Sequence, residues 1–265
     1  MRTLVVGDLH LLGSTVLPLV TAKLSDLAVD QVVLVGDYFD QWSETGNSEL
    51  YQRELVFLTD WVTALRAQGT PVVCLLGNHD VPYLTGSLSH YSSADPVVGR
   101  KISAGLFQLG CQLALKSDGY LLSHAGFVDT EAPEPWYFAP LSREHLSDLN
   151  RLEHNVGFSR GGLARWGSLL WADFDTELSG YFNPDYPRQI VGHTPVPQLT
   201  RECAGGTIID VDTFSLFSNH RPIGNGDLLL LVEGRVQTIS TDFIQALAIK
   251  QAQGDLFPPS SQNWF

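Results

Sequence analysis

Side chains that can bind metal ions stand where five apolar runs of the sequence end. Each run reads as a strand, and the polar residues come within a few positions of its end. They are, in chain order, Asp8, His10, Asp37, Asp40, Asn78, His79, His124 and His193. Because the carboxyl ends of the strands in an α/β sheet line one crevice, we expect these side chains to meet there.

This set of side chains favours a site for two cations. Carboxylate, amide and imidazole groups, together with water, suit a pair of ions that share one carboxylate at roughly 3.5–4 Å. With no thiolate in the set, Mn²⁺, Fe or Zn²⁺ fits better than Ca²⁺ or a structural zinc.

Each piece alone also has a simpler explanation. Gly-Asp or Gly-Asn after a strand is usually a turn, because these residues tolerate positive φ, and a lone His in an apolar strand is usually a core residue. The ordered recurrence of all five pieces favours the metal site. The histidines outside this pattern are expected at the surface: His90, His145, His154 and His220.

The elements that position these residues can be outlined from periodicity. The first half alternates strands and helices, with continuous apolar strands typical of a buried, largely parallel sheet. Its expected elements are strand 3–7, helix 16–27, strand 31–36, helix 49–68 and strand 71–77. The second half is richer in strands, expected at 120–123, 189–192, 206–211, 227–233 and 236–240, with a hairpin at 233–235.

The chain is interpreted as one domain, 1–265. Residues 127–188 are rich in proline and aromatics, with one helical stretch at 142–155, and are expected as an elaboration over the active-site face. The tail 254–265 is predicted to add little to the fold.

Composition excludes several classes of protein. With 44% hydrophobic and 17% charged residues in 265, the chain is neither disordered nor fibrous. A net charge of −13 argues against bulk nucleic-acid binding, whereas small phosphorylated substrates stay possible because bound cations invert the local field. Cys74, Cys111 and Cys203 lack metal-site spacing and are expected as buried thiols in a reducing compartment. We expect no membrane partner and a cytoplasmic location, since neither a spanning segment nor a signal peptide is recognisable.

The combined motif resembles the signature of the calcineurin-like metallophosphoesterases. It comprises Asp8-x-His10, Gly36-Asp37-x-x-Asp40, Gly77-Asn78-His79-Asp80, an isolated His124 and Gly192-His193. The resemblance extends from residue 3 to about 212. It implies a four-layer α/β/β/α sandwich of two mixed sheets flanked by helices.

Three blocks are most similar to the phosphoprotein-phosphatase branch, which includes symmetrical dinucleoside-tetraphosphate hydrolases. They are Ser123-His124-Ala125-Gly126, Leu169-Leu170-Trp171-Ala172-Asp173 and Gly192-His193-Thr194-Pro195. The first two motifs also resemble lipid-A-pathway pyrophosphatases, but those usually keep a Gly-His-x-His ending that this chain lacks.

The resemblance also implies roles. Asp8, His10 and Asp37 would hold one divalent ion, and Asp37, Asn78, His124 and His193 the other, with Mn²⁺ preferred and Fe, Zn²⁺ or Ni²⁺ as alternatives. A hydroxide between the ions would attack phosphorus in line. His79 would protonate the leaving oxygen, and Asp40 would hold the other ring nitrogen.

One departure concerns the phosphate clamp. Phosphoprotein phosphatases carry an Arg where this chain has Gln41, and a neutral amide cannot replace a bidentate guanidinium. Arg160 and Arg165 are candidate replacements, although their Gly-rich setting is equally that of a flexible turn. Aromatic residues at 136–138 and 166–171 could stack a nucleobase, or form a local core.

The sequence therefore predicts a phosphoric-ester hydrolase, with a phosphomonoesterase of the serine/threonine phosphoprotein-phosphatase type favoured. A hydrolase of dinucleoside polyphosphates such as diadenosine tetraphosphate is the alternative. Its substrate would be a phosphorylated small molecule, a nucleotide or a phosphoprotein. An inactive scaffold is disfavoured, because every ligand and His79 are present.

Overall fold

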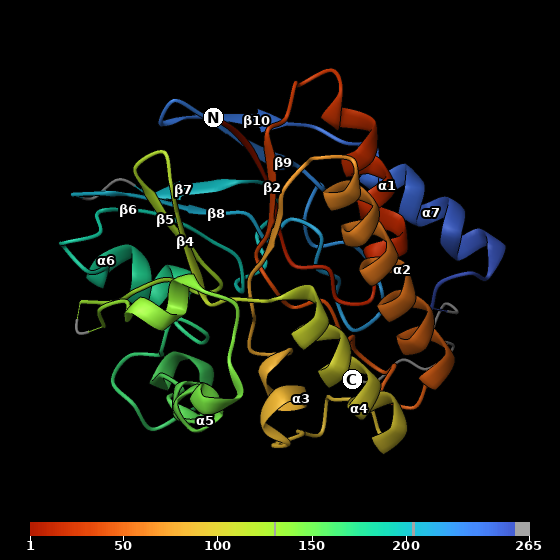
Figure 1. Cartoon of the computed structure of the whole chain (residues 1–265), viewed down its shortest axis with the longest axis horizontal. Coiled ribbons are helices and arrows are strands. Elements are labelled where there is room, and N and C mark those ends of the chain that lie inside the picture. Colours follow the sequence, from red (N-terminus) through yellow and green to blue (C-terminus); the bar gives the residue numbers. More distant parts are fainter. Residues whose placement is uncertain (130, 203–204, 258–265) are drawn as a thin grey trace.

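The computed structural model describes residues 1–129, 131–202 and 205–257, and contains two mixed five-stranded sheets (Figure 1). The first sheet has the order β10-β9-β1-β2-β3. Its strands are β1 (Arg2–Val6), β2 (Gln31–Leu34), β3 (Val72–Cys74), β9 (Leu228–Val232) and β10 (Arg235–Ile239). β1, β2 and β3 are parallel, and the hairpin of β9 and β10 continues the sheet with β9 antiparallel to β1.

The second sheet has the order β4-β5-β6-β8-β7. Its strands are β4 (Ala114–Ser117), β5 (Tyr120–Ser123), β6 (Arg188–Val191), β7 (Thr200–Glu202) and β8 (Thr207–Asp210). β5, β6 and β8 are parallel, whereas β4 and β7 run antiparallel at the two edges. Each sheet thus contains three parallel strands, and their carboxyl ends are where a ligand site is expected.

The helices lie on the outer sides of the two sheets. α1 (Gly13–Leu24), α2 (Ser48–Ala67), α4 (Pro96–Leu109) and α7 (Phe243–Gln253) lie on the side of the first sheet, whereas α6 (Ser179–Tyr181) lies beside the second (Figure 1). α3 (Val81–Thr85) packs against α4 and against α5 (Leu146–His154). This arrangement is the predicted four-layer sandwich.

The apolar strands are buried on both faces because two cores flank the first sheet. In β1, Val5 faces the second sheet and packs with Val33, Ile190 and Val211. Its neighbours Leu4 and Val6 face the helices instead. A third core joins β6 and β8 to residues 125–178, including Phe174 and Leu178.

Most strands lie within one or two residues of their predicted bounds, but the strands β4 and β7 and the helices α3, α4, α6 and α7 were not predicted. α4 has an amphipathic pattern, and Asp95 followed by Pro96 is a helix-start signal. Asp95 accepts a hydrogen bond from the backbone N–H of Val97 at 2.8 Å. The five strands that carry the candidate residues divide between the two sheets, in agreement with the two mixed sheets that the resemblance implies.

Two smaller expectations can also be compared with the structure. Cys74 and Cys111 are buried thiols, as predicted, and Cys203 lies outside the described residues. The start of the expected tail does contribute to the core, because Leu256 and Phe257 are only 3% and 2% exposed. None of the helices in the described ranges is long and apolar enough to cross a membrane.

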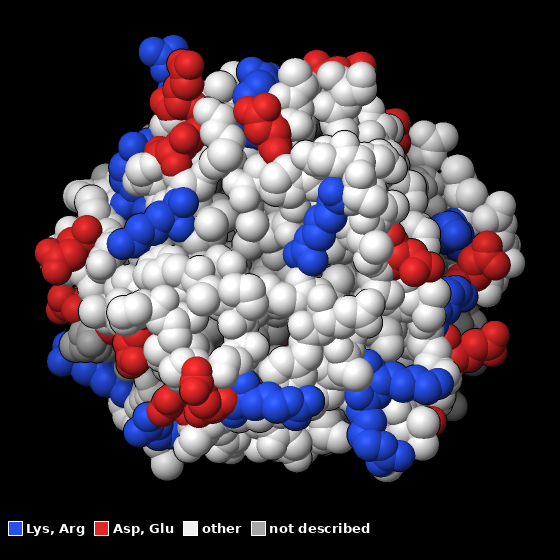
Figure 2. All heavy atoms as spheres, in the orientation of Figure 1, with Lys and Arg blue, Asp and Glu red and all other residues white. Residues whose placement is uncertain are grey.

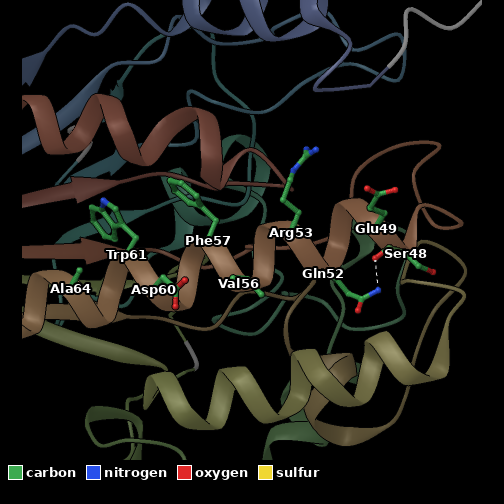
Figure 3. Close-up of a pocket in the computed structure, with 9 residues that line it drawn as sticks. All are labelled: Ser48, Glu49, Gln52, Arg53, Val56, Phe57, Asp60, Trp61 and Ala64. Atoms are coloured by element: carbon green, nitrogen blue, oxygen red, sulfur yellow. Dashed lines mark hydrogen bonds between the residues drawn. The ribbon is translucent and has the colours of Figure 1, made fainter.

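The molecular surface carries mixed charge. Figure 2 shows acidic and basic side chains interspersed along the rim of one face, whose middle is mostly uncharged. A hollow on the outer side of α2 is drawn in Figure 3; its lining comes from 48–64 and includes none of the predicted site residues. The chemistry therefore has to be sought at the strand ends.

Candidate metal centre and acid

Asp80 fixes the loops that follow β2 and β3. Its fully buried carboxylate accepts hydrogen bonds from the backbone N–H groups of Gly77, Asp37 and Tyr38 at 2.9, 2.8 and 3.1 Å. Three charge-assisted bonds to one carboxylate hold both loops in a single geometry. Asp37 and Asn78 are thereby positioned at the same end of the first sheet.

Asp37 lies at the centre of the site. Its Oδ1 accepts a hydrogen bond from the backbone N–H of His79 at 2.9 Å. Its Oδ2 lies 3.7 Å from Nε2 of His10 and 3.4 Å from Nε2 of His124. Burial alone raises the pKa of Asp37, but electrostatic attraction to the neighbouring imidazoles, those of His124 and His79 first, outweighs burial and holds that pKa well below its usual range.

Asp8 joins the first sheet to the second. Its Oδ2 accepts a hydrogen bond from the backbone N–H of His193 at 3.0 Å, whereas its buried Oδ1 has no hydrogen-bond partner among the described residues. Gly192 permits this approach, because a Cβ there would lie only 2.1 Å from Asp8 Oδ1. A side chain at position 192 would displace the carboxylate.

Backbone carbonyls set the orientation of two imidazoles. Nδ1 of His10 donates to the carbonyl of Asp40 at 2.8 Å, and Nδ1 of His124 donates to the carbonyl of Val35 at 3.0 Å. In the neutral rings each Nε2 is then a bare acceptor, the usual state of a metal-binding imidazole.

The candidate ligand atoms form two groups that share Asp37. One comprises Asp8, His10 and Asp37, the other Asp37, His124 and His193, and the ligand atoms within each group lie within 4.8 Å of one another. Asn78 adds an amide oxygen 3.0 Å from Nε2 of His124. This oxygen and the bare Nε2 of His124 are both acceptors, so they cannot hydrogen-bond to each other. Asp8 Oδ1 and His193 Nε2 are buried without a hydrogen-bond partner among the described residues. Bound cations would satisfy all four atoms, so the residues fit them.

His79 and Asp40 form a pair beside these groups. Nδ1 of His79 lies 3.2 Å from Oδ2 of Asp40. Tyr51 and Tyr83 donate their hydroxyl protons to Oδ1 of the same carboxylate, Tyr51 at 2.9 Å. Burial lowers the pKa of His79, but Asp37 and the bond to Asp40 raise it to about 9. The imidazole, 23% exposed, is thus held protonated near neutral pH.

Several site residues have left-handed backbone. The φ angles are +41° at His10, +51° at Asp37, +65° at Asp40 and +71° at His193. Such angles are uncommon outside glycine; Asp and His adopt them more readily than most other residues, but at a cost in free energy that surrounding contacts must offset. The simpler explanation of Gly-Asp as a turn is therefore correct for the backbone. The same turns also bring the side chains together, as a metal site requires.

Comparison with known proteins decides the family. The family model of the calcineurin-like phosphoesterases matches residues 1–232. The chain belongs to this family. The resemblance and the fold predicted from the motifs are confirmed, and the chain is a phosphoesterase and a hydrolase. No curated protein matches it at a significant level.

Solved structures share the fold of this calcineurin-like phosphoesterase. A cold-active protein-tyrosine phosphatase of a psychrophilic Shewanella species is 17% identical with a TM-score of 0.53, over 92% of this chain and 78% of that one. A protein serine/threonine phosphatase from Saccharomyces cerevisiae is 15% identical with a TM-score of 0.52, over 91% and 80%. Both share the two-sheet architecture.

The structure separates the two candidate clamp residues of this phosphoesterase. Nη2 of Arg160 donates to Oγ1 of Thr194 at 2.7 Å, directly after His193, and its Nε lies 3.0 Å from Oδ2 of Asp173. Burial and the charge of Arg160 lower the pKa of His193. Arg165 is exposed, with its guanidinium over the ring of Trp166 at 4.9 Å. Only Arg160 is placed beside the candidate ligands.

The aromatic residues of 136–138 and 166–171 mostly pack locally. Trp136 stacks on His145 at 4.5 Å, and Tyr137 is buried. Trp171 differs, because its ring lies 5.7 Å from that of His193 and its Nε1 donates to Glu153 at 3.1 Å. The local-core explanation thus fits Trp136 and Tyr137, while Trp171 forms part of the wall of the site.

Other site neighbours were missed or misplaced. Tyr91 packs its ring 4.4 Å from that of His79, and nothing in its local sequence announces this. The expectation that His220 lies at the surface was wrong: it is 4% exposed, and its Nε2 donates to the carbonyl of Trp42 at 3.1 Å. The ring of Phe257 packs against it in a tilted arrangement, with the two ring centroids 4.6 Å apart.

Proposed function

We propose that the chain is a dinuclear metal-dependent phosphomonoesterase of the serine/threonine phosphoprotein-phosphatase type. The observation that carries the proposal is the His79–Asp40 pair, held beside two groups of ligand atoms that share Asp37. A shared carboxylate suits two cations, and an adjacent protonated imidazole suits the departure of an alkoxide.

Asp8, His10 and Asp37 would hold one divalent ion, and Asp37, Asn78, His124 and His193 the other. When bound, the ions supply a water of lowered pKa and positive charge facing the phosphoryl oxygens. Oxygen and imidazole ligands suit Mn²⁺, with Fe, Zn²⁺ or Ni²⁺ as alternatives.

His79 would donate a proton to the leaving oxygen. Asp40 occupies Nδ1, so the proton leaves from Nε2, and the carboxylate stabilises the charged ring before transfer. The hydroxyls of Tyr51 and Tyr83 fix the carboxylate, which keeps the imidazole orientation constant through the reaction.

Arg160 would bind the phosphoryl group of the substrate. Its guanidinium is next to His193, and its contacts with Thr194 and Asp173 hold the planar group in place. Gln41 does not offer a comparable anion site, because a neutral amide cannot replace a bidentate guanidinium.

A hydrolase of dinucleoside polyphosphates is the second candidate. The observation that favours it is Trp42, which is 60% exposed and directly follows Gln41 at the loop after β2. An exposed indole can stack a nucleobase.

An activity screen distinguishes the candidates. The purified chain is assayed with p-nitrophenyl phosphate, a phosphoserine peptide and diadenosine tetraphosphate, each with Mn²⁺ and with chelator. We expect Mn²⁺-dependent release of phosphate from the first two. Preference for diadenosine tetraphosphate would establish the second candidate, and no turnover of any substrate would favour an inactive scaffold.

A further inference from the structure

The third parallel strand of the second sheet also ends in a carboxylate, and the proposed function leaves it unassigned. β8 ends at Asp210, and Asp212 follows two residues later, as Asp8 follows β1 and His193 follows β6. The backbone of β8 stays in register past its end, since Val211 donates its N–H to the carbonyl of Val191 at 2.8 Å. Asp212 thus lies at the carboxyl end of a parallel strand, where the other candidate ligands also lie.

Close packing places Asp212 beside Asp8. A Cβ at Gly7 would lie 3.2 Å from the Cα of Asp212, so these two backbones touch immediately before Asp8. Burial raises the pKa of Asp212, and the charge of His10 opposes the rise. Among the charges that raise the pKa of Asp8, Asp212 acts more strongly than Asp37. Asp212 therefore faces the first group of candidate ligands.

The described residues offer the carboxylate of Asp212 little stabilisation: the nearby hydroxyl of Ser215 lowers its pKa, but no group lies in full hydrogen-bonding geometry. The residue is 1% exposed, and both Oδ atoms are buried without a hydrogen-bond partner in the part of the chain that the structure describes. Oδ1 of Asp8 is in the same condition. Two buried carboxylates with unpaired oxygens side by side are costly unless a cation or its water molecules lie between them.

Asp212 is placed differently from the direct ligands. Asp8, His10 and Asp37 bring ligand atoms within 4.8 Å of one another, and Asp212 is not part of that group. A carboxylate at this position can accept hydrogen bonds from water on the cation, which is how outer carboxylates tune metal sites.

We propose that Asp212 is the outer carboxylate of the first cation position, where it accepts hydrogen bonds from the water ligands of the ion and strengthens its binding. The inference rests on the proposed two-cation function. It assigns a role to the strand end that follows the Gly-His-Thr-Pro block, where this chain has no second histidine.

The test compares Asp212→Asn with the matched control Asp210→Asn. Asp210 is also buried and ends β8, but it raises the pKa of Asp8 less than Asp212 and Asp37 do. Its Oδ1 accepts the backbone N–H of Asp212 at 2.9 Å, a bond that the oxygen of an asparagine can also accept. Mn²⁺ binding is measured by equilibrium dialysis on metal-free protein. In Asp212→Asn we expect one of two affinities to fall about 10–100-fold and the other to stay unchanged. Asp210→Asn is expected to bind as the wild type does.

Thermal unfolding gives a readout with a distinctive sign. Removing an unpaired buried charge should raise the Tm of metal-free Asp212→Asn, while the gain in Tm on adding Mn²⁺ becomes smaller than in the wild type. A purely structural role would lower the metal-free Tm. If the variant does not fold, the same pair of measurements on Asp212→Ser takes its place.

The outcomes separate this inference from the proposed function. Unchanged Mn²⁺ affinities in Asp212→Asn, or equal losses in both variants, overturn the role of Asp212 and leave the function standing. If the wild type binds one Mn²⁺, the two-cation function fails, and the affinity for that ion still decides for or against Asp212. A wild type that binds none overturns both.

Discussion

The first sheet supplies the candidate site with the carboxylates of Asp8 and Asp37, whereas β5 and β6 of the second supply the imidazoles of His124 and His193. The loops of the first sheet are tied to one another, through Asp80 and through the bond from His79 to Asp37. The second-sheet residues are held by contacts to the first sheet, such as the N–H of His193 on Asp8. The first-sheet loops are thus held by bonds among themselves, and the second-sheet residues are held by bonds to the first sheet. Substitutions in the two sheets should therefore differ in their effect on metal binding.

The largest effect is expected from Asp37→Asn. Because this carboxylate belongs to both ligand groups, its loss should release both ions and lower kcat/KM by at least about 100-fold. Metal content after reloading with Mn²⁺ and phosphatase activity provide the measurements.

The matched change in the other half is His193→Asn, which should weaken one ion and spare the other. Equal metal loss in the two variants would contradict the distinction between a shared carboxylate and a second-sheet imidazole.

His79→Asn tests the acid separately from the metals. Both ions should stay bound, and kcat should fall about 100-fold or more for phosphoserine, whose alkoxide needs a proton. The loss for p-nitrophenyl phosphate should be small, since its phenolate leaves unprotonated. Asp40→Asn should show the same pattern more weakly. An equal loss on the two substrates would instead assign His79 to phosphate binding.

Arg160→Gln tests whether the guanidinium beside His193 binds the substrate. Loss of a guanidinium that binds the substrate's phosphoryl group should raise KM about tenfold with a smaller effect on kcat. Arg165→Gln, in the same loop but exposed, is the control and should change KM less than about twofold. Similar values in the two variants would argue against Arg160 as the anchor.

The smallest effect concerns pH and Glu153, on α5. Burial raises the pKa of Glu153 to about 8. The hydrogen bond from Trp171 and the charge of His79 lower this pKa, whereas the charges of Asp37 and Asp80 raise it further. Because the folded protein binds this proton more tightly than the unfolded chain does, its stabilising contribution is complete below about pH 4.5 and is lost as pH rises through about 8. Glu153→Gln should therefore raise Tm by a few degrees at pH 8.5 relative to the wild type, and much less at pH 5. A pH-independent difference in Tm would contradict this.

Much of the candidate site could be predicted from the sequence because its residues stand in short motifs directly after strands. Asp8, Asp37 and Asn78 each follow an apolar run directly, so strand and ligand are read together. Tyr51 and Tyr83, which bind Asp40, come from helices whose patterns record only burial. Their hydroxyl groups contact Asp40 only in the folded chain, and no sequence spacing predicts this contact.

The fold shows the same limit. The motifs identified the family and with it the two sheets, whereas periodicity alone does not tell which strands belong to which sheet. Arg160 and Arg165 share one loop, and only the turn at 158–161 decides that the first points back to Thr194. Both arginines lie near glycines in one short segment, and this local sequence does not specify which guanidinium turns towards the site.

The left-handed backbone at His10, Asp37, Asp40 and His193 has a consequence for how this protein can be improved by selection or design. At such angles glycine or asparagine is more comfortable than the residue present, so replacements there would relieve strain while removing the site. A search guided by folding free energy alone would therefore be drawn to these very positions. A thermostable variant that keeps its activity has to gain its stability elsewhere.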